Sequence, residues 1–181
     1  MDKTTSALVS GAAVLTAAVI GARNGPQRPA TAAWYALLRK PSYTPPGPAI
    51  GAVWGVLELL LAGTGYRLLH AKPGDARNAA VGAWGATLLG LAGFPYLFFR
   101  EKKLASSTAA SGAMLVTALG TVVAAREVDK PAAAMTVPLA LWVGFATVLS
   151  AQLWRRNRWL SLACYRHGCR QDRQGNQRAS R

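Results

Sequence analysis

Five long apolar segments, separated by short polar or proline-rich breaks, dominate the 181-residue chain. Each segment has about the length of roughly 20 residues that a helix needs to cross a bilayer. The pattern therefore predicts an all-α membrane protein, built as a bundle of five transmembrane helices. The predicted spans cover residues 4–22, 49–69, 79–99, 104–125 and 132–154.

The longest break, residues 23–47, lies between the first and second spans and is rich in proline. Proline has no backbone N–H and keeps the preceding residue out of the α region, so residues 40–48 are predicted to form a stiff, extended connection. Long loops of this kind are commonly functional, which favours a lid. The alternative is a surface connector with a short interfacial helix at residues 34–39. The prolines concerned are Pro41, Pro45, Pro46 and Pro48.

Charge supports the membrane interpretation. The chain is 51% hydrophobic yet carries a formal charge of +14, and its Lys and Arg residues gather in the breaks and after Trp154. A basic recognition helix or an aromatic and basic sheet pattern is missing, so membrane lipid is the expected partner and nucleic acid is not. Residues 158–181 form a basic tail that is predicted to be disordered.

The distribution of basic residues also predicts the topology. With five spans, one side of the membrane receives six of the 21 Lys and Arg residues, and the side with the long loop and the tail receives the other fifteen. Because cytoplasmic segments carry the excess of basic residues, the tail is predicted to be cytosolic.

Glu58 is the one charged residue in the middle of a predicted span. A carboxylate at that depth costs roughly 2.5–3.5 kcal/mol on insertion scales, so it should face a cavity or a partner, or be protonated. Helical spacing places Glu58 one turn from Trp54 on the same face. It therefore either lines a pocket with Trp54 or forms a hydrogen bond, as a neutral acid, to a neighbouring helix.

Two sequence blocks resemble one family. The pattern W-Y-x-x-L-x-K-P-x-x-x-P-P followed by V-W runs from Trp34 to Trp54, and VPLALWVGFATVLSAQLWRRN runs from Val137 to Asn157. Both are similar to the translocator protein family, also called the tryptophan-rich sensory proteins or peripheral benzodiazepine receptors. The resemblance implies a five-helix bundle, commonly a homodimer, whose pocket under the first loop binds porphyrins, sterols and related drugs. It also implies that residues 4–22 are a retained helix, although their small apolar composition would also suit a signal peptide.

The resemblance implies a set of ligand-binding residues from the lid, the second span and the fifth span. Glu58 adds a carboxyl where the family usually has Tyr, and Ser150-Ala151 replaces an Asn-Tyr pair whose Tyr belongs to the sterol-recognition pattern. No metal site and no required cofactor are expected, because Cys164, His167 and Cys169 do not match a zinc pattern. The predicted ligand-binding residues are Tyr35, Pro45, Pro46, Trp54, Glu58, Trp142, Phe145 and Ala146.

The function implied is that of an integral membrane receptor or transport-type protein. It would bind a haem-type tetrapyrrole, a sterol or a similar flat hydrophobic ligand for sensing, trafficking or scavenging. The alternative is an enzyme that oxidises bound porphyrin in light, for which the sequence offers no mid-span His, no Ser–His pair and no metal cluster. The expected location is the mitochondrial outer membrane or the endoplasmic reticulum in a eukaryote, and the cell membrane in a bacterium.

Overall fold

The computed structural model describes residues 1–26 and 29–158, and this part of the chain contains helices and no strands. Five of its helices are long and apolar enough to cross a membrane, which confirms the predicted fold class. Apart from Arg158, the predicted disordered tail lies outside the described residues. The elements are α1 (Lys3–Arg23), α2 (Pro29–Leu37), α3 (Gly47–His70), α4 (Asp75–Pro95), the π-helical turn η1 (Tyr96–Arg100), α5 (Leu104–Arg126) and α6 (Lys130–Arg156).

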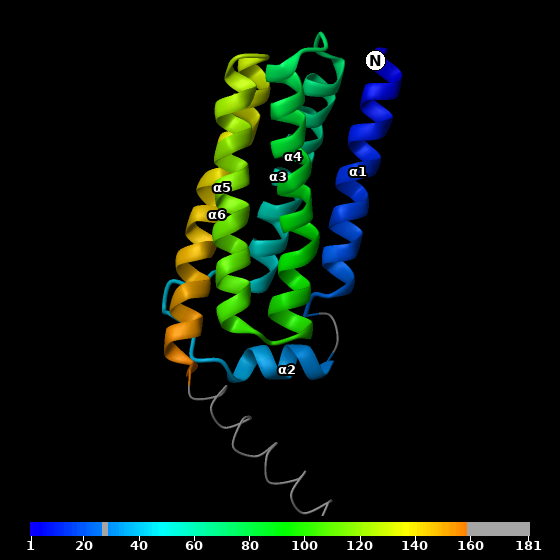
Figure 1. Cartoon of the computed structure of the whole chain (residues 1–181). Coiled ribbons are helices and arrows are strands. Elements are labelled where there is room, and N and C mark those ends of the chain that lie inside the picture. The colour runs from blue at the N-terminus through cyan, green and yellow to red at the C-terminus, as the bar shows by residue number, and fades with distance from the viewer. Residues whose placement is uncertain (27–28, 159–181) are drawn as a thin grey trace, which may run out of the picture.

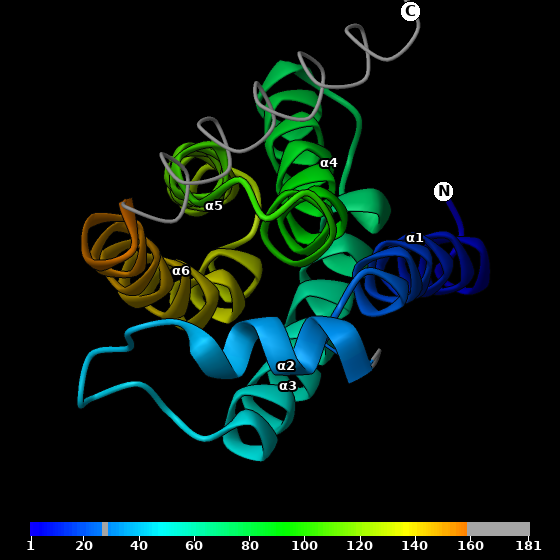
Figure 2. The ribbon, with the colours of Figure 1, turned by 90° about the horizontal axis from the view of Figure 1, so that it is seen from below.

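The five long helices form a ring in the order α1, α3, α6, α5 and α4, each packed against its neighbours, with α4 closing the ring on α1 (Figure 2). One end of the bundle carries the N-terminus and the α3–α4 and α5–α6 connections (Figure 1). The other end, called here the lid end, carries α2, the proline-rich segment, the α4–α5 connection and the end of α6. The two ends therefore collect the same segments that the charge pattern assigns to the two sides of the membrane.

The outer surface of the bundle is apolar. Leu59 of α3 is 76% exposed and Leu141 of α6 is 71% exposed, and comparable residues lie on the other long helices. Large apolar side chains exposed at these fractions are favourable in hydrocarbon and unfavourable in water. The surface therefore supports the assignment of the five helices as membrane spans.

Small hydroxyl side chains fill much of the interior and join the helices in pairs. Thr87 of α4 donates a hydrogen bond to Thr117 of α5 over 3.2 Å, and the Ser111 and Thr147 hydroxyls lie 2.9 Å apart between α5 and α6. In hydrocarbon such interhelical bonds contribute about 0.6–1.7 kcal/mol each. The buried hydroxyl residues are Ser6, Ser10, Thr64, Thr87, Ser107, Ser111, Thr121, Thr136 and Ser150.

Gly65 of α3 lies at the tightest contact between helices α1, α3 and α4. A Cβ added at this position would overlap the Trp84 ring of α4 and the Ser10 hydroxyl of α1. Next to it, the Trp84 indole Nε1 donates a hydrogen bond to the Leu61 carbonyl over 2.9 Å, and the Ser10 hydroxyl donates to the Ala62 carbonyl over 2.6 Å. Both bonds go to backbone carbonyls of α3, so this contact fixes α3 against two neighbouring helices.

Pro95 disturbs the regular hydrogen bonding near the end of α4. It has no N–H to donate to the carbonyl of Leu91, and the chain continues beyond it as the π-helical turn η1. Gly21 of α1 packs against this irregularity, because a Cβ there would lie 3.0 Å from the Leu91 carbonyl oxygen. Phe98 of this turn is buried, and Trp34 and Tyr35 of α2 pack against it.

Candidate functional site

The connection between α1 and α3 crosses the lid end of the bundle (Figures 1 and 2). Its first part is the helix α2, which begins at Pro29 and ends at Leu37. The short helix considered as the alternative for this loop, at residues 34–39, is therefore present, but it begins and ends earlier in the chain. Proline is well placed at the start of a helix, where its missing N–H would have no partner, and the proline-rich segment beyond Leu38 cannot continue one.

The proline-rich segment is less extended than predicted. Within it the chain makes a turn in which the Thr44 N–H donates a hydrogen bond to the Pro41 carbonyl over 3.1 Å. The prediction of a continuous extended connection over residues 40–48 also fails at its end, since Gly47 and Pro48 already belong to the first turn of α3. Proline is tolerated in that turn because its nitrogen has no helical acceptor.

Aromatic side chains attach α2 to the bundle. Trp34 and Tyr35 make edge-on contacts with Phe98, with ring centroids 5.8 Å and 6.1 Å apart. Burial in this cluster raises the pKa of the Tyr35 phenol. The Lys40 Nζ lies 4.5 Å from the centre of the Tyr35 ring, a favourable cation–π distance. The Tyr35 ring thus packs between α2 and η1 at the lid end of the bundle.

Asn157, which follows α6, is fully buried and fixes the lid to that helix. Its Oδ1 accepts a hydrogen bond from the backbone N–H of Arg39 over 2.9 Å, 118 residues earlier in the chain. Its Nδ2 donates to the carbonyls of Arg39 and Leu153 over 3.2 Å and 2.8 Å. One side chain therefore satisfies both backbone groups of a lid residue, a role that its position in the sequence does not indicate.

An apolar cavity of about 430 Å³, shallow and open to the outer surface of the bundle, lies between residues 52–60 of α3 and residues 138–142 of α6. Its size falls within the range of about 300–1,000 Å³ that is usual for ligand pockets, and none of its lining side chains is charged. The sequence alone does not distinguish most of these residues from other apolar residues of the spans. The lining residues are Ala52, Val53, Val56, Leu57, Leu60, Pro138 and Trp142.

Trp142 connects the cavity to the lid through a row of aromatic rings. Its ring lies 5.5 Å from that of Phe145, and Phe145 lies 6.2 Å from Tyr43 of the lid. The Trp142 Nε1 atom is buried and has no hydrogen-bond partner among the described residues. A buried donor without an acceptor costs about 1–3 kcal/mol, a cost that a hydrogen-bond acceptor on a ligand could remove.

The other predicted ligand-binding residues lie around this site without lining the cavity. Trp54 is half-buried against the main core of the bundle, and Ala146 is half-buried on α6. In the lid, Pro45 is half-buried and Pro46 is exposed. The structure therefore brings Trp142, Phe145 and the lid together, and the ligand contacts of all eight residues stay predictions.

Glu58 is half-buried on α3 and is not among the residues that line the cavity. At about 100° per residue, the Glu58 side chain points roughly 100° away from Leu57 and about 160° away from Val56, both of which line the cavity. Helical spacing relates Glu58 to Trp54 as predicted, but the cavity described here opens on a different face of α3. A role for Glu58 in ligand binding stays a prediction.

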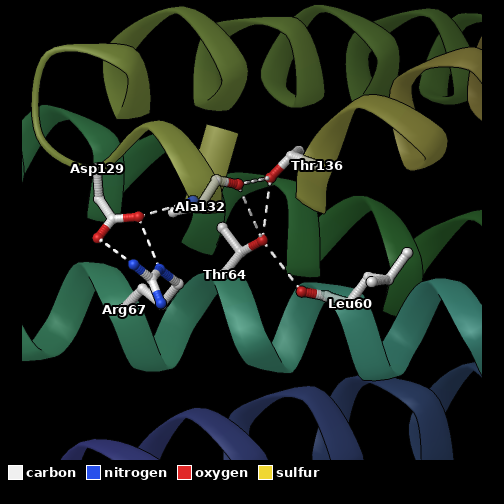
Figure 3. A network of polar contacts seen from close by, with 6 residues as sticks. All are labelled: Leu60, Thr64, Arg67, Asp129, Ala132 and Thr136. Carbon is white, nitrogen blue, oxygen red and sulfur yellow. Dashed lines mark hydrogen bonds and ion pairs between the residues drawn. The ribbon is translucent and has the colours of Figure 1, made fainter. Parts of the chain in front are cut away.

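Beyond the cavity, polar contacts hold α3 and α6 together (Figure 3). The Arg67 guanidinium donates to both carboxylate oxygens of Asp129 over 2.7 Å and 3.0 Å. Asp129 also caps α6 by accepting from the Ala132 N–H over 2.8 Å. One turn nearer the lid, the hydroxyls of Thr64 and Thr136 lie 3.1 Å apart. The helices are thus clamped at the end opposite the lid.

The Asp129 clamp predicts a loss of stability in acid. The hydrogen bond from Arg67 holds the pKa of Asp129 below its ordinary value, so its stabilising effect is present above the unfolded pKa, near 4, and is lost as pH falls through the folded pKa. Both side chains are partly exposed, so we expect an effect of about 1 kcal/mol or less. We expect the unfolding temperature in detergent to fall less between about pH 6 and 3 for Asp129→Asn than for wild type. The asparagine keeps a capping oxygen. Equal losses in both proteins would contradict the assignment.

The fold and this site define an integral, multi-pass membrane protein with five spanning helices and a lid over one end. The model of the TspO/MBR family matches residues 10–155, and the chain belongs to that family. Curated relatives agree: the chain is similar to the translocator proteins of sheep (Ovis aries), cattle (Bos taurus) and human (Homo sapiens), with 29%, 28% and 30% identity over 126 residues. Each match covers 68% of this chain and 75% of the relative.

Proposed function

We propose that this protein binds a flat hydrophobic ligand, a porphyrin or other tetrapyrrole, a sterol or a similar molecule, under its first loop. The observation that carries the proposal is the apolar cavity beside Trp142, next to a lid that is joined to α6. The binding would serve sensing, trafficking or scavenging of the ligand.

The chemistry of the site favours a tetrapyrrole. Trp142 offers a large aromatic face at the cavity and an indole donor that has no acceptor in the described part of the chain. Arg39 and Lys40 follow α2 in the lid, where cationic groups suit the carboxylates at one edge of a porphyrin. The apolar lining suits the opposite edge of the macrocycle, which carries no charge.

A titration of purified protein with protoporphyrin IX tests this function. Binding near Trp142 should quench tryptophan fluorescence saturably, because an absorbing macrocycle would lie close to the indole. A quenching curve that rises linearly with porphyrin concentration would contradict a defined site. The same sample under illumination separates binding from turnover, since light-dependent oxidation would change the porphyrin spectrum in a manner that depends on Trp142.

The lid end and the tail are placed on the cytosolic side in this proposal, on the strength of fifteen basic residues against six. Labelling of Cys164 and Cys169 in intact cells or organelles with an impermeant reagent should occur from the cytosolic face. Protection from that reagent would reverse the orientation. The membrane would be the mitochondrial outer membrane or the endoplasmic reticulum in a eukaryote and the cell membrane in a bacterium, and the assembly a homodimer.

A further inference from the structure

The helix α3 is held firmly along one half and weakly along the other. Its hydrogen bonds to neighbouring helices involve residues 61–69, where Leu61 and Ala62 accept from α4 and α1, Thr64 contacts Thr136, and Arg67 pairs with Asp129. Gly63 adds a close contact, since a Cβ there would lie 3.2 Å from the Met135 sulfur of α6. This half of α3 is therefore fixed to three other helices.

In the described part of the chain, the lid-side half of α3 is held by apolar packing, chiefly of Leu57, Val53 and Trp54, and by no hydrogen bond to another helix. A Cβ added at Gly51 or Gly55 would meet no atom within 4 Å, so both glycines face open space. Val56, between the cavity and the outer surface, is 58% exposed. Glycine within a helix costs roughly 0.5–1 kcal/mol relative to alanine, because it leaves more backbone freedom in the unfolded chain. Residues 47–60 are thus the less firmly held part of α3.

The cavity lies beside this weakly held half and opens sideways. Ala52, Val56 and Pro138 all line it and are all exposed on the surface of the bundle, at a depth where hydrocarbon surrounds the protein. The opposite wall is firm, because α6 is bonded to α5 through Thr147 and Ser111. On the aqueous side, Asn157 fixes the lid to α6.

We propose that the open cavity, or groove, between α3 and α6 is a lateral gate, which widens by movement of α3 so that ligand enters it directly from the bilayer. The lid-side half of α3 is the moving part, α6 is the fixed part, and the clamp at Arg67 and Asp129 is the end about which the groove opens. The identity of the ligand rests on the proposed function, but the movement does not. Because the lining has no charged side chain, the gate admits bilayer-dissolved molecules whose leading edge is apolar and uncharged.

Distance measurements between spin labels test the gate without any ligand. The full chain, with Cys164 and Cys169 changed to Ser, is labelled in lipid nanodiscs at Ala49→Cys and Val148→Cys across the lid-side half of the groove. A second sample carries His70→Cys and Lys130→Cys across the clamped half; all four positions are exposed. We expect the lid-side pair to give a distance distribution at least twice as broad as the clamped pair.

Adding Gly51→Ala and Gly55→Ala should narrow the lid-side distribution, because alanine stiffens the helix and has room at both positions. The matched control, Gly11→Ala with Gly112→Ala, also fills open space on other helices and should leave the width unchanged. Equal widths for the two pairs, or no narrowing by the α3 substitutions, would overturn the gate. If the gate behaves as expected but protoporphyrin IX leaves the lid-side distribution unchanged, the proposed ligand fails while the movement stands.

A nitroxide at Val56→Cys tests which medium the groove faces. We expect dissolved oxygen, which concentrates in hydrocarbon, to relax this label at least five times more strongly than a water-soluble nickel chelate does. A stronger effect of the nickel chelate would show that the groove opens to water and would overturn the lateral route.

Discussion

Replacing Trp84 with alanine is expected to lower the free energy of unfolding by about 3 kcal/mol. Trp84 is buried between α3 and α4 and donates to the Leu61 carbonyl, so its loss leaves a cavity and removes a hydrogen bond. The expected value is near the lower end for Trp→Ala in soluble cores, because helices in a bilayer gain packing rather than hydrophobic transfer energy when they associate. Unfolding in mixed micelles by a denaturing detergent measures the difference.

Two further variants separate packing from the hydrogen bond at this position. Trp84→Phe keeps much of the volume and loses the donor, so we expect roughly 1–2 kcal/mol. Trp154→Ala is the matched control, because that ring is 37% exposed near the end of α6, and it should change stability by less than about 0.5 kcal/mol. Equal losses for Trp84→Ala and Trp154→Ala would show that the contact at Gly65 does not hold α3 in place.

Replacing Trp142 with alanine is expected to weaken porphyrin binding by about 1–3 kcal/mol, or roughly 5- to 150-fold in Kd. The ring lines the cavity, and its indole is a donor without a partner in the described part of the chain. Trp142→Phe should keep most of the stacking and lose the hydrogen bond. Its Kd for porphyrin should therefore lie between those of wild type and Trp142→Ala.

Isothermal or fluorescence titration with protoporphyrin IX measures these affinities, and Trp154→Ala again serves as the control for tryptophan loss. The thermal stability of each variant distinguishes a damaged site from a damaged fold. An unchanged Kd in a well-folded Trp142→Ala protein would place the ligand away from this wall of the cavity.

The five spans can be predicted from the sequence because an apolar run of bilayer length has few other stable forms. Each predicted span lies within one of the helical segments, with ends that differ by a few residues where capping decides the boundary. Asp129, for example, starts α6 at Lys130 by accepting from the Ala132 N–H, two residues before the apolar run begins. The irregular end of α4 is likewise predictable, since Pro95 has no N–H to donate.

Contacts between segments that are distant in the chain could not be predicted from the sequence. Asn157 is recognisable as part of a family pattern, but its bonds to Arg39 appear only when the end of α6 and the lid meet in space. Gly65 likewise looks like any small residue in a span, although the ring of Trp84 occupies the space that its side chain would need. Both roles depend on packing between helices, which local patterns do not specify.

The face of α3 that borders the cavity could not be predicted from the sequence either. Spacing shows that Trp54 and Glu58 share a face of α3, but it does not show which face meets α6. The cavity lies on the side of Val56 and Leu60, so the residues that line it are ordinary aliphatic ones. Trp142 stands out in both the sequence and the structure, because it is large, lies at a family position and borders the cavity.

In the proposed function a planar tetrapyrrole binds under the lid beside Trp142, and Trp54 is a further predicted contact that does not line the cavity. The measurement that tests it most directly is the binding isotherm of protoporphyrin IX for the double variant Trp54→Ala, Trp142→Ala, compared with wild type in the same lipid nanodiscs. The account predicts that a folded double variant loses saturable binding over the concentration range in which wild type saturates. An isotherm that superimposes on that of wild type would contradict it.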